Sequence, residues 1–342
     1  MSIRKKLPKL KPTDYESFIN RRKFVRNLGL GAAGCVIGGV AASQFPELIF
    51  AQDPKKRPNA LKPPFSRPGV FPAKRNTKFN LKKLSVTSRS AAATHNNFYE
   101  FLPGRGGPVY KYTGDFVVDP WTVEISGECE KPASFDLDDI FKIEHEERIY
   151  HFRCVETWSM NVPWTGFPLK KLLDKVKPKS SAKFVRFTSA NRPEQMPGVR
   201  EAPYYTWPYV EALRMDEAVH DLTLVATGIF GKPLLKQHGS PLRIVCPWKY
   251  GYKNPKSIVK IELLDSKPDT FWNVANPREY GFLSNVNPNV PHPRWSQAEE
   301  YVIGRKSKRY PTKIFNGYAE FVGDLYPDEP KTPLSHAPSL PR

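Results

Sequence analysis

Proline occupies 35 of the 342 positions, and only 39% of the residues are hydrophobic. Proline removes a backbone donor and interrupts helices and central strands, so long regular elements are disfavoured. This composition favours many loops and short strands over a helical bundle. A chain of this length can bury a sizeable core in one or two domains. We expect one compact α+β domain, preceded by a proline-rich arm.

The first 51 residues have the features of an export signal. Adjacent arginines, Arg21 and Arg22, precede a Gly/Ala-rich apolar stretch from Leu28 to Ser43, as in twin-arginine signals. The stretch is short for a spanning helix, which needs about 20 apolar residues. We expect residues 1–51 to be a cleaved signal peptide; cleavage after Ser43 and an uncleaved membrane anchor are the alternatives. The twin-arginine translocase exports folded proteins, often with a cofactor inserted, so the leader indicates a periplasmic, cofactor-binding protein.

The rest of the chain divides into an arm and a folded domain. Residues 52–93 are rich in Pro, Lys and Arg and are expected to lie extended, whereas residues 94–342 form the domain. Apolar runs and alternation predict strands at Trp121–Gly127, Arg148–Cys154, Lys183–Ser189, Leu222–Thr227, Leu242–Cys246 and Ser257–Leu264. Helices are predicted at Phe135–Phe141 (capped by Ser134 or Asp136), at Phe167–Val176 and from Pro208 to Met215. The segment from residue 265 is expected to wrap around the domain.

The formal net charge of +19 favours anionic partners, such as an acidic protein, a phosphate-bearing ligand or anionic lipid. Nucleic acid is not an expected partner, because the basic residues are dispersed and show no zinc-finger or RNP pattern. A non-catalytic, exported basic protein that binds anionic surfaces stays open as an alternative.

The four cysteines, Cys35, Cys129, Cys154 and Cys246, include no C-x-x-C pair. Cys35 lies in the leader, so the other three cannot all be paired, and their spacing does not suit zinc. We expect Cys129 and Cys246 to be buried free thiols, with a disulfide between them as the alternative. A lone thiol in an oxidising compartment oxidises or pairs, so the sulfur of Cys154 is expected to be occupied. A transition metal is the best candidate, because soft thiolates suit such ions.

Four motifs carry a family resemblance. They are Asn96-Asn97-Phe98-Tyr99-Glu100-Phe101, the run from Arg153-Cys154-Val155-Glu156-Thr157-Trp158 to Leu169, Arg192-Pro193-Glu194-Gln195-Met196-Pro197-Gly198, and Pro241-Leu242-Arg243 with Pro247-Trp248-Lys249-Tyr250-Gly251-Tyr252-Lys253. With them the chain resembles the catalytic subunits of periplasmic molybdenum-dependent protein-methionine-sulfoxide reductases, from the leader to the C-terminus. The resemblance implies an α+β fold, with a single mixed or barrel-like molybdopterin-binding domain of the sulfite oxidase type. It also implies a monomeric catalytic subunit without the extra dimerisation domain of related enzymes.

The resemblance further implies one Mo-molybdopterin per chain, with Cys154 as the metal ligand and catalytic residue. The cofactor-contacting positions that it implies are Asn96, Tyr99, Glu100, Ser189, His238, Arg243, Asn254, Pro255 and Lys256. Ser189 stands where the family has threonine and keeps the hydroxyl, and His238 stands where the family has asparagine but can still donate a hydrogen bond. The residue types suit these roles: Arg243 and Lys256 can bind a phosphate, and Asn96 and Glu100 can pair with the edge of a heterocycle.

The implied reaction is the reduction of methionine sulfoxide residues in oxidised periplasmic proteins, by oxygen-atom transfer to the Cys-ligated metal. Electrons would come from outside the chain, since the sequence has no C-x-x-C-H haem-attachment motif or flavin motif. The resemblance implies a haem-containing membrane subunit as the donor. A sulfite dehydrogenase or a reductase for small S- or N-oxides is the alternative within the same superfamily. Sulfite is an anion, yet no cation follows Cys154 until Lys170, and Glu156 would repel it. The sequence therefore favours the sulfoxide reductase.

Overall fold

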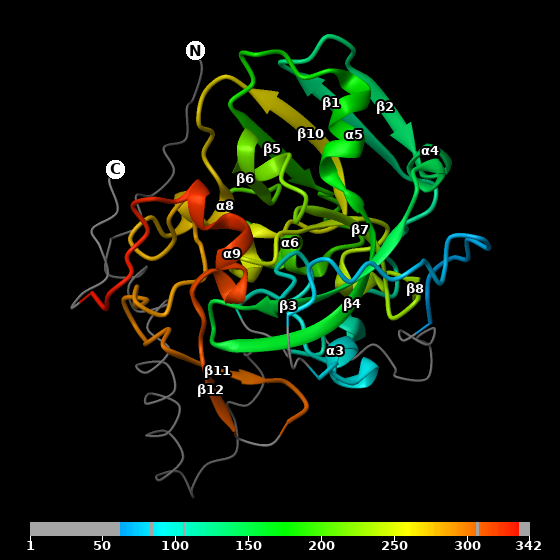
Figure 1. Ribbon diagram of the computed structural model, residues 1–342. Coiled ribbons are helices and arrows are strands. Elements are labelled where there is room, and N and C mark those ends of the chain that lie inside the picture. Colours follow the sequence, from blue (N-terminus) through cyan, green and yellow to red (C-terminus); the bar gives the residue numbers. More distant parts are fainter. Residues whose placement is uncertain (1–61, 82–84, 105–106, 306–307, 335–342) are drawn as a thin grey trace, which may run out of the picture. The chain divides into compact units, whose positions relative to one another are not determined.

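The computed structural model describes residues 62–81, 85–104, 107–305 and 308–334 (Figure 1). The chain divides into two compact units, Met1–Lys56 and Arg57–Arg342, and every described residue belongs to the second. The predicted signal peptide, with Cys35, and the start of the predicted arm lie outside the described residues. Within the described ranges, no helix combines the length and the apolar character needed to cross a lipid bilayer.

The first of two sheets has five strands. Their order is β2 (Ala133–Asp136), β1 (Thr122–Gly127), β10 (Ile258–Leu264), β5 (Phe184–Ser189) and β6 (Val210–Arg214). The β1–β10 pair is parallel and the other pairs are antiparallel. Strand β1 has one buried face, because Val123 and Ile125 alternate with the exposed Thr122 and Glu124.

The second sheet has seven strands around β4 (Trp158–Pro168). Strands β12 (Arg309–Pro311), β11 (Glu299–Val302), β4, β7 (Leu224–Ile229) and β8 (Lys232–Pro233) follow one another, while β3 (Glu146–Arg153) pairs with β4 and β9 (Arg243–Val245) with β7. Ten of the eleven residues of β4 are buried, so it lacks the alternation that marks a half-exposed strand. Gly166 allows β7 to approach, since a Cβ there would lie 2.0 Å from the carbonyl oxygen of Val225.

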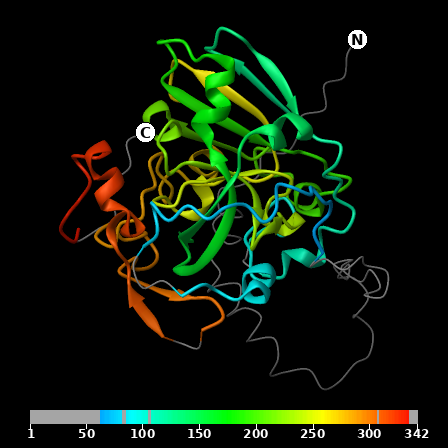
Figure 2. The same ribbon diagram turned by 45° about the vertical axis from the view of Figure 1, so that its right-hand side comes forward.

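The helices are short, with four to eight residues each. They are α3 (Arg89–Thr94), α4 (Leu137–Lys142), α5 (Leu169–Val176), α6 (Pro197–Glu201), α7 (Met215–Ala218), α8 (Phe271–Ala275) and α9 (Ala319–Val322). Helix α5 buries Leu169, Leu172, Leu173 and Val176, which share one helical face. In Figures 1 and 2 the five-stranded sheet lies toward one end of this unit, and the β11–β12 hairpin lies toward the other.

The predicted α+β class is confirmed, but the strands form two mixed sheets instead of a single barrel-like one. Strand β4 pairs with β3, β7 and β11, and β7 also pairs with β8 and β9; none of these strands pairs with β1 or β10. All six predicted strands and the predicted Phe167–Val176 helix begin and end within two residues of the observed elements. Cys129 and Cys246 are free and buried, as expected.

Two predicted helices differ from the structure. Phe135 belongs to β2, where it pairs with Val123, and α4 begins only at Leu137. Its cap is Asp136, the second of the two candidates, whose carboxylate accepts from the backbone N–H of Asp139 at 2.8 Å. Residues 210–214 form strand β6 rather than a helix, because the open edge of β5 offers them backbone partners.

Candidate active site

Cys154 is the first residue of the tight turn that joins β3 to β4. Its backbone N–H donates to the carbonyl of Trp158 at 2.9 Å, and the N–H of Thr157 donates back to the carbonyl of Cys154 at 3.1 Å. Thr157 closes the turn with a φ of 73°, in the left-handed region that β-branched residues rarely enter. Strand β11 stabilises the turn, because the N–H of Tyr301 donates to the carbonyl of Thr157 at 3.0 Å. The cysteine is thus presented at the end of a buried hairpin.

The sulfur of Cys154 faces two N–H donors. The backbone nitrogen of Glu156 lies 3.4 Å and Nδ2 of Asn97 lies 3.5 Å from Sγ. Burial, and then the Glu156 carboxylate, raise the pKa of Cys154 to about 12, so the metal-free side chain is a thiol at neutral pH. The two donors favour the anionic sulfur, which is the form that ligates metal ions.

A second group of hydrogen bonds holds the backbone on both sides of Cys154. Arg153 is fully buried, and its Nη2 donates to Oε1 of Gln297 at 2.9 Å. Nε2 of Gln297 and Nε1 of Trp295 both donate to the carbonyl of Val155 at 2.9 Å. Residues on both sides of Cys154 are therefore held by the C-terminal segment of the chain.

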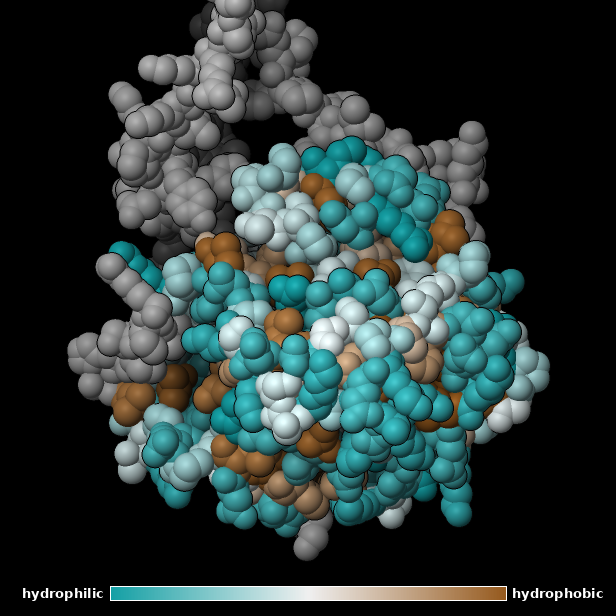
Figure 3. All heavy atoms as spheres, turned by 90° about the horizontal axis from the view of Figure 1, so that it is seen from above, coloured by the Kyte–Doolittle hydropathy of each residue, from teal (hydrophilic) through white to brown (hydrophobic). Residues whose placement is uncertain are grey.

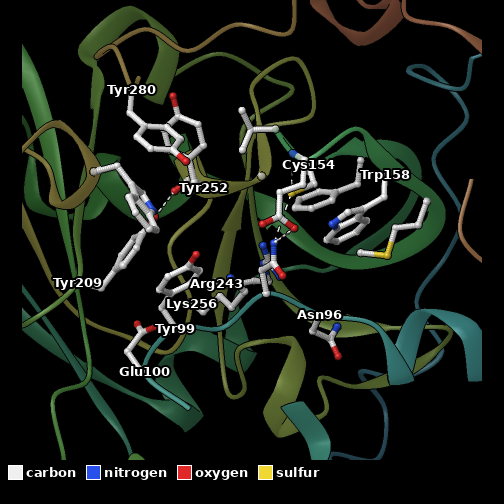
Figure 4. A pocket seen from close by; sticks show the side chains of 17 residues that line it. Asn96, Tyr99, Glu100, Cys154, Trp158, Tyr209, Arg243, Tyr252, Lys256 and Tyr280 are labelled. Atoms are coloured by element: carbon white, nitrogen blue, oxygen red, sulfur yellow. Dashed lines mark hydrogen bonds between the residues drawn. The ribbon is translucent and has the colours of Figure 1, made fainter. Parts of the chain in front are cut away.

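A cavity of about 790 Å³, counted with its open mouth, lies at Cys154 (Figure 4). Six of the ten residues predicted from the sequence line it: Asn96, Tyr99, Glu100, Cys154, Arg243 and Lys256. They come from the loop after α3, the β3–β4 turn, β9 and the turn before β10. Most of the remaining wall is apolar or aromatic and includes Trp158, Tyr209, Tyr252, Trp272 and Tyr280.

Two cations of the cavity, the buried Arg243 and the half-buried Lys256, have no carboxylate within salt-bridge distance in the described part of the chain. Arg243 donates to three backbone carbonyls, those of His238 at 3.0 Å and of Asn254 and Ile244 at 3.3 Å. Burial lowers the pKa of Arg243 to about 9. Burial, and then the charge of Arg243, lower the pKa of Lys256 to about 7. Both shifts reflect the cost of burying positive charge. A bound anion such as a phosphate would offset that cost.

Glu100 adds a carboxyl group to the same cavity. Burial raises its pKa to about 7, and the charge of Lys256 opposes this rise. A carboxyl group that is easily protonated can donate as well as accept a hydrogen bond. Glu100 can therefore pair with a ligand edge that carries both donors and acceptors.

Three predicted residues have a buried polar atom without a hydrogen-bond partner among the described residues. The atoms are Oδ1 of Asn96, Oγ of Ser189 and Nδ1 of His238. Nε2 of His238 donates to the carbonyl of Ala92 at 3.1 Å, and burial lowers its pKa to about 4, so Nδ1 is an unprotonated acceptor. The N–H that was expected to reach the ligand is used within the protein instead. Unpaired buried atoms are costly, and of these three residues only Asn96 lines the cavity, so its Oδ1 indicates a polar ligand there.

The remaining predicted residues, Ser189, His238, Asn254 and Pro255, do not line the cavity. The side chain of Asn254 is used within the fold: its Oδ1 accepts from the N–H of Cys246, and its Nδ2 donates to the carbonyl of Tyr250 at 3.1 Å. The turn that follows brings Lys256 into a backbone bridge with Arg243. Asn254 and Pro255 thus shape the cavity from behind it.

The structure also brings in residues that the sequence did not single out as a site. Asn97 and Glu156 lie inside the recognised motifs, and Nδ2 of Asn97 donates to Oε2 of Glu156 at 3.2 Å. Trp272 and Tyr280 belong to the segment that was expected only to wrap around the domain. No spacing links these two positions to Cys154, so only the folded chain reveals that they line the same cavity.

Comparisons with known proteins agree with this geometry. The family model for the oxidoreductase molybdopterin binding domain matches residues 110–272. The protein-methionine-sulfoxide reductase catalytic subunit MsrP of Xanthomonas axonopodis pv. citri is 45% identical over 330 residues, which cover 94% of this chain and 95% of its own. The MsrP of Xanthomonas campestris pv. campestris is 45% identical over 334 residues, 95% of this chain and 97% of its own. Among solved structures, the sulfane dehydrogenase SoxCD from Paracoccus pantotrophus aligns with 66% of this chain and 57% of its own, at 18% identity and a TM-score of 0.39, too distant a likeness to support a conclusion.

Proposed function

This chain belongs to the family of protein-methionine-sulfoxide reductase catalytic subunits, and we propose that it reduces methionine sulfoxide residues in oxidised periplasmic proteins. It is a molybdenum-dependent oxidoreductase whose cofactor is Mo-molybdopterin. In the proposed site, Sγ of Cys154 is the protein ligand of the metal. The observation that carries the proposal is a single cavity that holds this cysteine together with Arg243 and Lys256, two cations that form no ion pair with any described residue.

The residues of the cavity fit the cofactor. Arg243 and Lys256 would bind its phosphate, because a buried anion removes the cost of their own burial. Asn96 and Glu100 would pair with the edge of the pterin, for which Oδ1 of Asn96 is unpartnered. When bound, the cofactor supplies the oxygen-atom transfer and the change of redox state.

The protein contributes positioning and exclusion of water. The Cys154 turn holds the sulfur in place through Thr157 and Trp158. The apolar and aromatic wall limits water around the reacting atoms. Each turnover converts the sulfoxide, two electrons and two protons into a thioether and water. The sulfoxide is neutral, so it needs no cation of its own beside Cys154.

An activity assay with a small electron donor tests this function. The purified, metal-loaded protein is assayed with dithionite-reduced viologen against free and peptide-bound methionine sulfoxide, with sulfite and an electron acceptor in a parallel assay. We expect turnover of the sulfoxides and close to one molybdenum per chain. Oxidation of sulfite without reduction of the sulfoxides would support the sulfite dehydrogenase alternative, and a protein without molybdenum would contradict the enzyme itself.

We also propose that the chain is exported by the twin-arginine translocase and works in the periplasm as a monomeric catalytic subunit. A haem-containing membrane subunit would supply its electrons. The support is the Arg21-Arg22 pair before a short apolar stretch. Replacing both arginines with lysine should leave the precursor in the cytoplasm, as measured by cell fractionation; normal export of the double variant would contradict the signal assignment.

A further inference from the structure

Four aromatic side chains form a continuous row that ends in the cavity. The ring centroids of Tyr204 and Tyr205 are 4.8 Å apart, those of Tyr205 and Trp272 are 6.0 Å apart, and those of Trp272 and Tyr280 are 4.9 Å apart. Trp272 and Tyr280 line the cavity that contains Cys154. In Figure 4, Tyr280 lies on the far side of the cavity from Asn96, Glu100 and Arg243, the side chains assigned to the cofactor. We call Tyr204, Tyr205, Trp272 and Tyr280 the aromatic row.

The outer end of the aromatic row is exposed to solvent. Tyr204 is 58% exposed, the largest value among the exposed large hydrophobic side chains of the described residues. Val274, which follows Trp272 on α8, is 47% exposed, and Leu283 lies three residues beyond Tyr280 and is 37% exposed. The face of the protein drawn in Figure 3 is largely hydrophilic, with apolar side chains in small groups. An exposed aromatic side chain joined by ring contacts to a reactive cavity indicates a binding surface.

The inner part of the aromatic row is held in place by the fold. Nδ2 of Asn273 donates to the carbonyl of Tyr280 at 3.0 Å, and the N–H of Tyr280 donates to the carbonyl of Asn276 at 3.2 Å. The ring of Tyr99 packs edge-on against Trp272, with 4.8 Å between centroids. A surface that is already ordered loses little conformational entropy when a flexible ligand binds to it.

We propose that the aromatic row is the docking site for the polypeptide that flanks a methionine sulfoxide in an extended segment of an oxidised protein. This inference rests on the proposed reductase function. An extended chain advances about 3.3 Å per residue, so each step of the row corresponds to one or two residues of substrate. Aromatic faces contact apolar neighbours, and tyrosine hydroxyls can bond backbone amides. The row carries no charge, which matches a neutral sulfoxide and allows many flanking sequences.

Tyr204 offers the sharpest test, because it lies at the outer end of the row. Loaded wild type and Tyr204→Ala are compared with reduced viologen as donor, on a short neutral peptide with one methionine sulfoxide and on dimethyl sulfoxide. We expect KM for the peptide to rise about fivefold, the effect of losing one aromatic contact, while kcat changes little. The ratio of kcat/KM for the peptide to that for dimethyl sulfoxide should fall by the same factor. The matched control is Tyr310→Ala, which removes a half-buried tyrosine of β12 outside the row and should leave the ratio unchanged.

A binding measurement separates docking from catalysis. The same peptide with methionine in place of the sulfoxide, carrying a fluorescent label, is titrated with each loaded protein, and its Kd is read from the anisotropy. Tyr204→Ala should weaken binding by about the factor seen in KM. An unchanged Kd and KM for the peptide, or an equal loss on both sulfoxides, would overturn docking on the row. A wild type inactive on both sulfoxides would instead contradict the reductase function, and the Kd would still report on docking.

Discussion

Nε2 of Gln297 donates to the carbonyl of Val155 at 2.9 Å, so a residue of the C-terminal segment holds the backbone directly after Cys154. Its Oε1 accepts from Nη2 of Arg153, also at 2.9 Å, and Arg153 directly precedes the cysteine. One buried side chain therefore bridges the two neighbours of the proposed metal ligand. The position of the sulfur depends on this bridge, although Gln297 does not line the cavity.

Replacing Gln297 with leucine should lower both stability and turnover. The change removes both bonds and leaves buried polar groups less well paired, which costs about 1–3 kcal/mol of unfolding free energy. A shifted sulfur should also alter the spectrum of the loaded metal centre. Denaturant unfolding, the viologen assay and that spectrum measure the three effects. Gln195→Leu, which removes a half-buried glutamine that accepts from Val117 at 3.0 Å, is the control and should keep the wild-type spectrum. An unaltered spectrum for Gln297→Leu would mean that the bridge does not position the sulfur.

The parts of the fold that were predictable follow local patterns. The alternation in β1 and the helical spacing of Leu169, Leu172 and Val176 both arise from one buried face. Strand β4 was not predicted, because burial on both faces removes the alternation. The helix expected after Pro208 is a strand, because a partner edge outweighed local propensity.

Some residues of the candidate site could also be predicted from local sequence, whereas others depend on long-range contacts. Cys154 and Arg243 lie in motifs that can be recognised in the sequence, and Lys256 follows the last motif by three residues. The fold brings all three to one cavity. The bridge from Gln297 crosses 142 positions to Val155, and no local pattern records such a contact. Whether His238 can donate a hydrogen bond to a ligand depends on which ring nitrogen already bonds the protein. The sequence does not show that Nε2 is used by the carbonyl of Ala92.

Cys154→Ser should abolish reductase activity while the protein still unfolds cooperatively. A serine hydroxyl is smaller and is a poor ligand for a metal that prefers thiolate. Loss of residues that only support a metal ligand costs about 10–100-fold, so loss of the ligand itself should exceed that range in the viologen assay. Cys129→Ser changes a buried free thiol outside the cavity and should remain active. Wild-type turnover in Cys154→Ser would rule out the ligand assignment.

Arg243→Gln should reduce the amount of cofactor that the protein retains. It removes a charged donor for the phosphate, and bonds to charged groups contribute about 1.5–3 kcal/mol, or roughly 10–100-fold in affinity. Arg243→Lys should be intermediate, because lysine keeps the charge but not the planar fork. The measurement is molybdenum per chain after gel filtration. Arg186→Gln, whose arginine pairs with Glu262 at 2.7 Å on the first sheet, is the control. Equal molybdenum in Arg243→Gln and wild type would place the phosphate elsewhere.

His145→Asn should make the protein less sensitive to acid. His145 packs against Phe141 and Phe167, with centroids 5.6 and 5.2 Å away, and its Nδ1 lies 2.5 Å from the carbonyl of Ile143. Burial lowers its pKa to about 4, whereas the unfolded chain takes up the proton near pH 6.5. The unfolded state therefore binds more protons between these values, so stability falls as the pH drops from about 6.5 toward 4, by up to about 3 kcal/mol. Asparagine keeps a donor for Ile143 but does not titrate, so urea unfolding from pH 8 to 4 should show a shallower loss. Val123→Ala, which truncates a buried apolar side chain on β1, leaves His145 in place and should lower stability equally at every pH. A His145→Asn curve parallel to wild type would show that His145 does not cause the acid sensitivity.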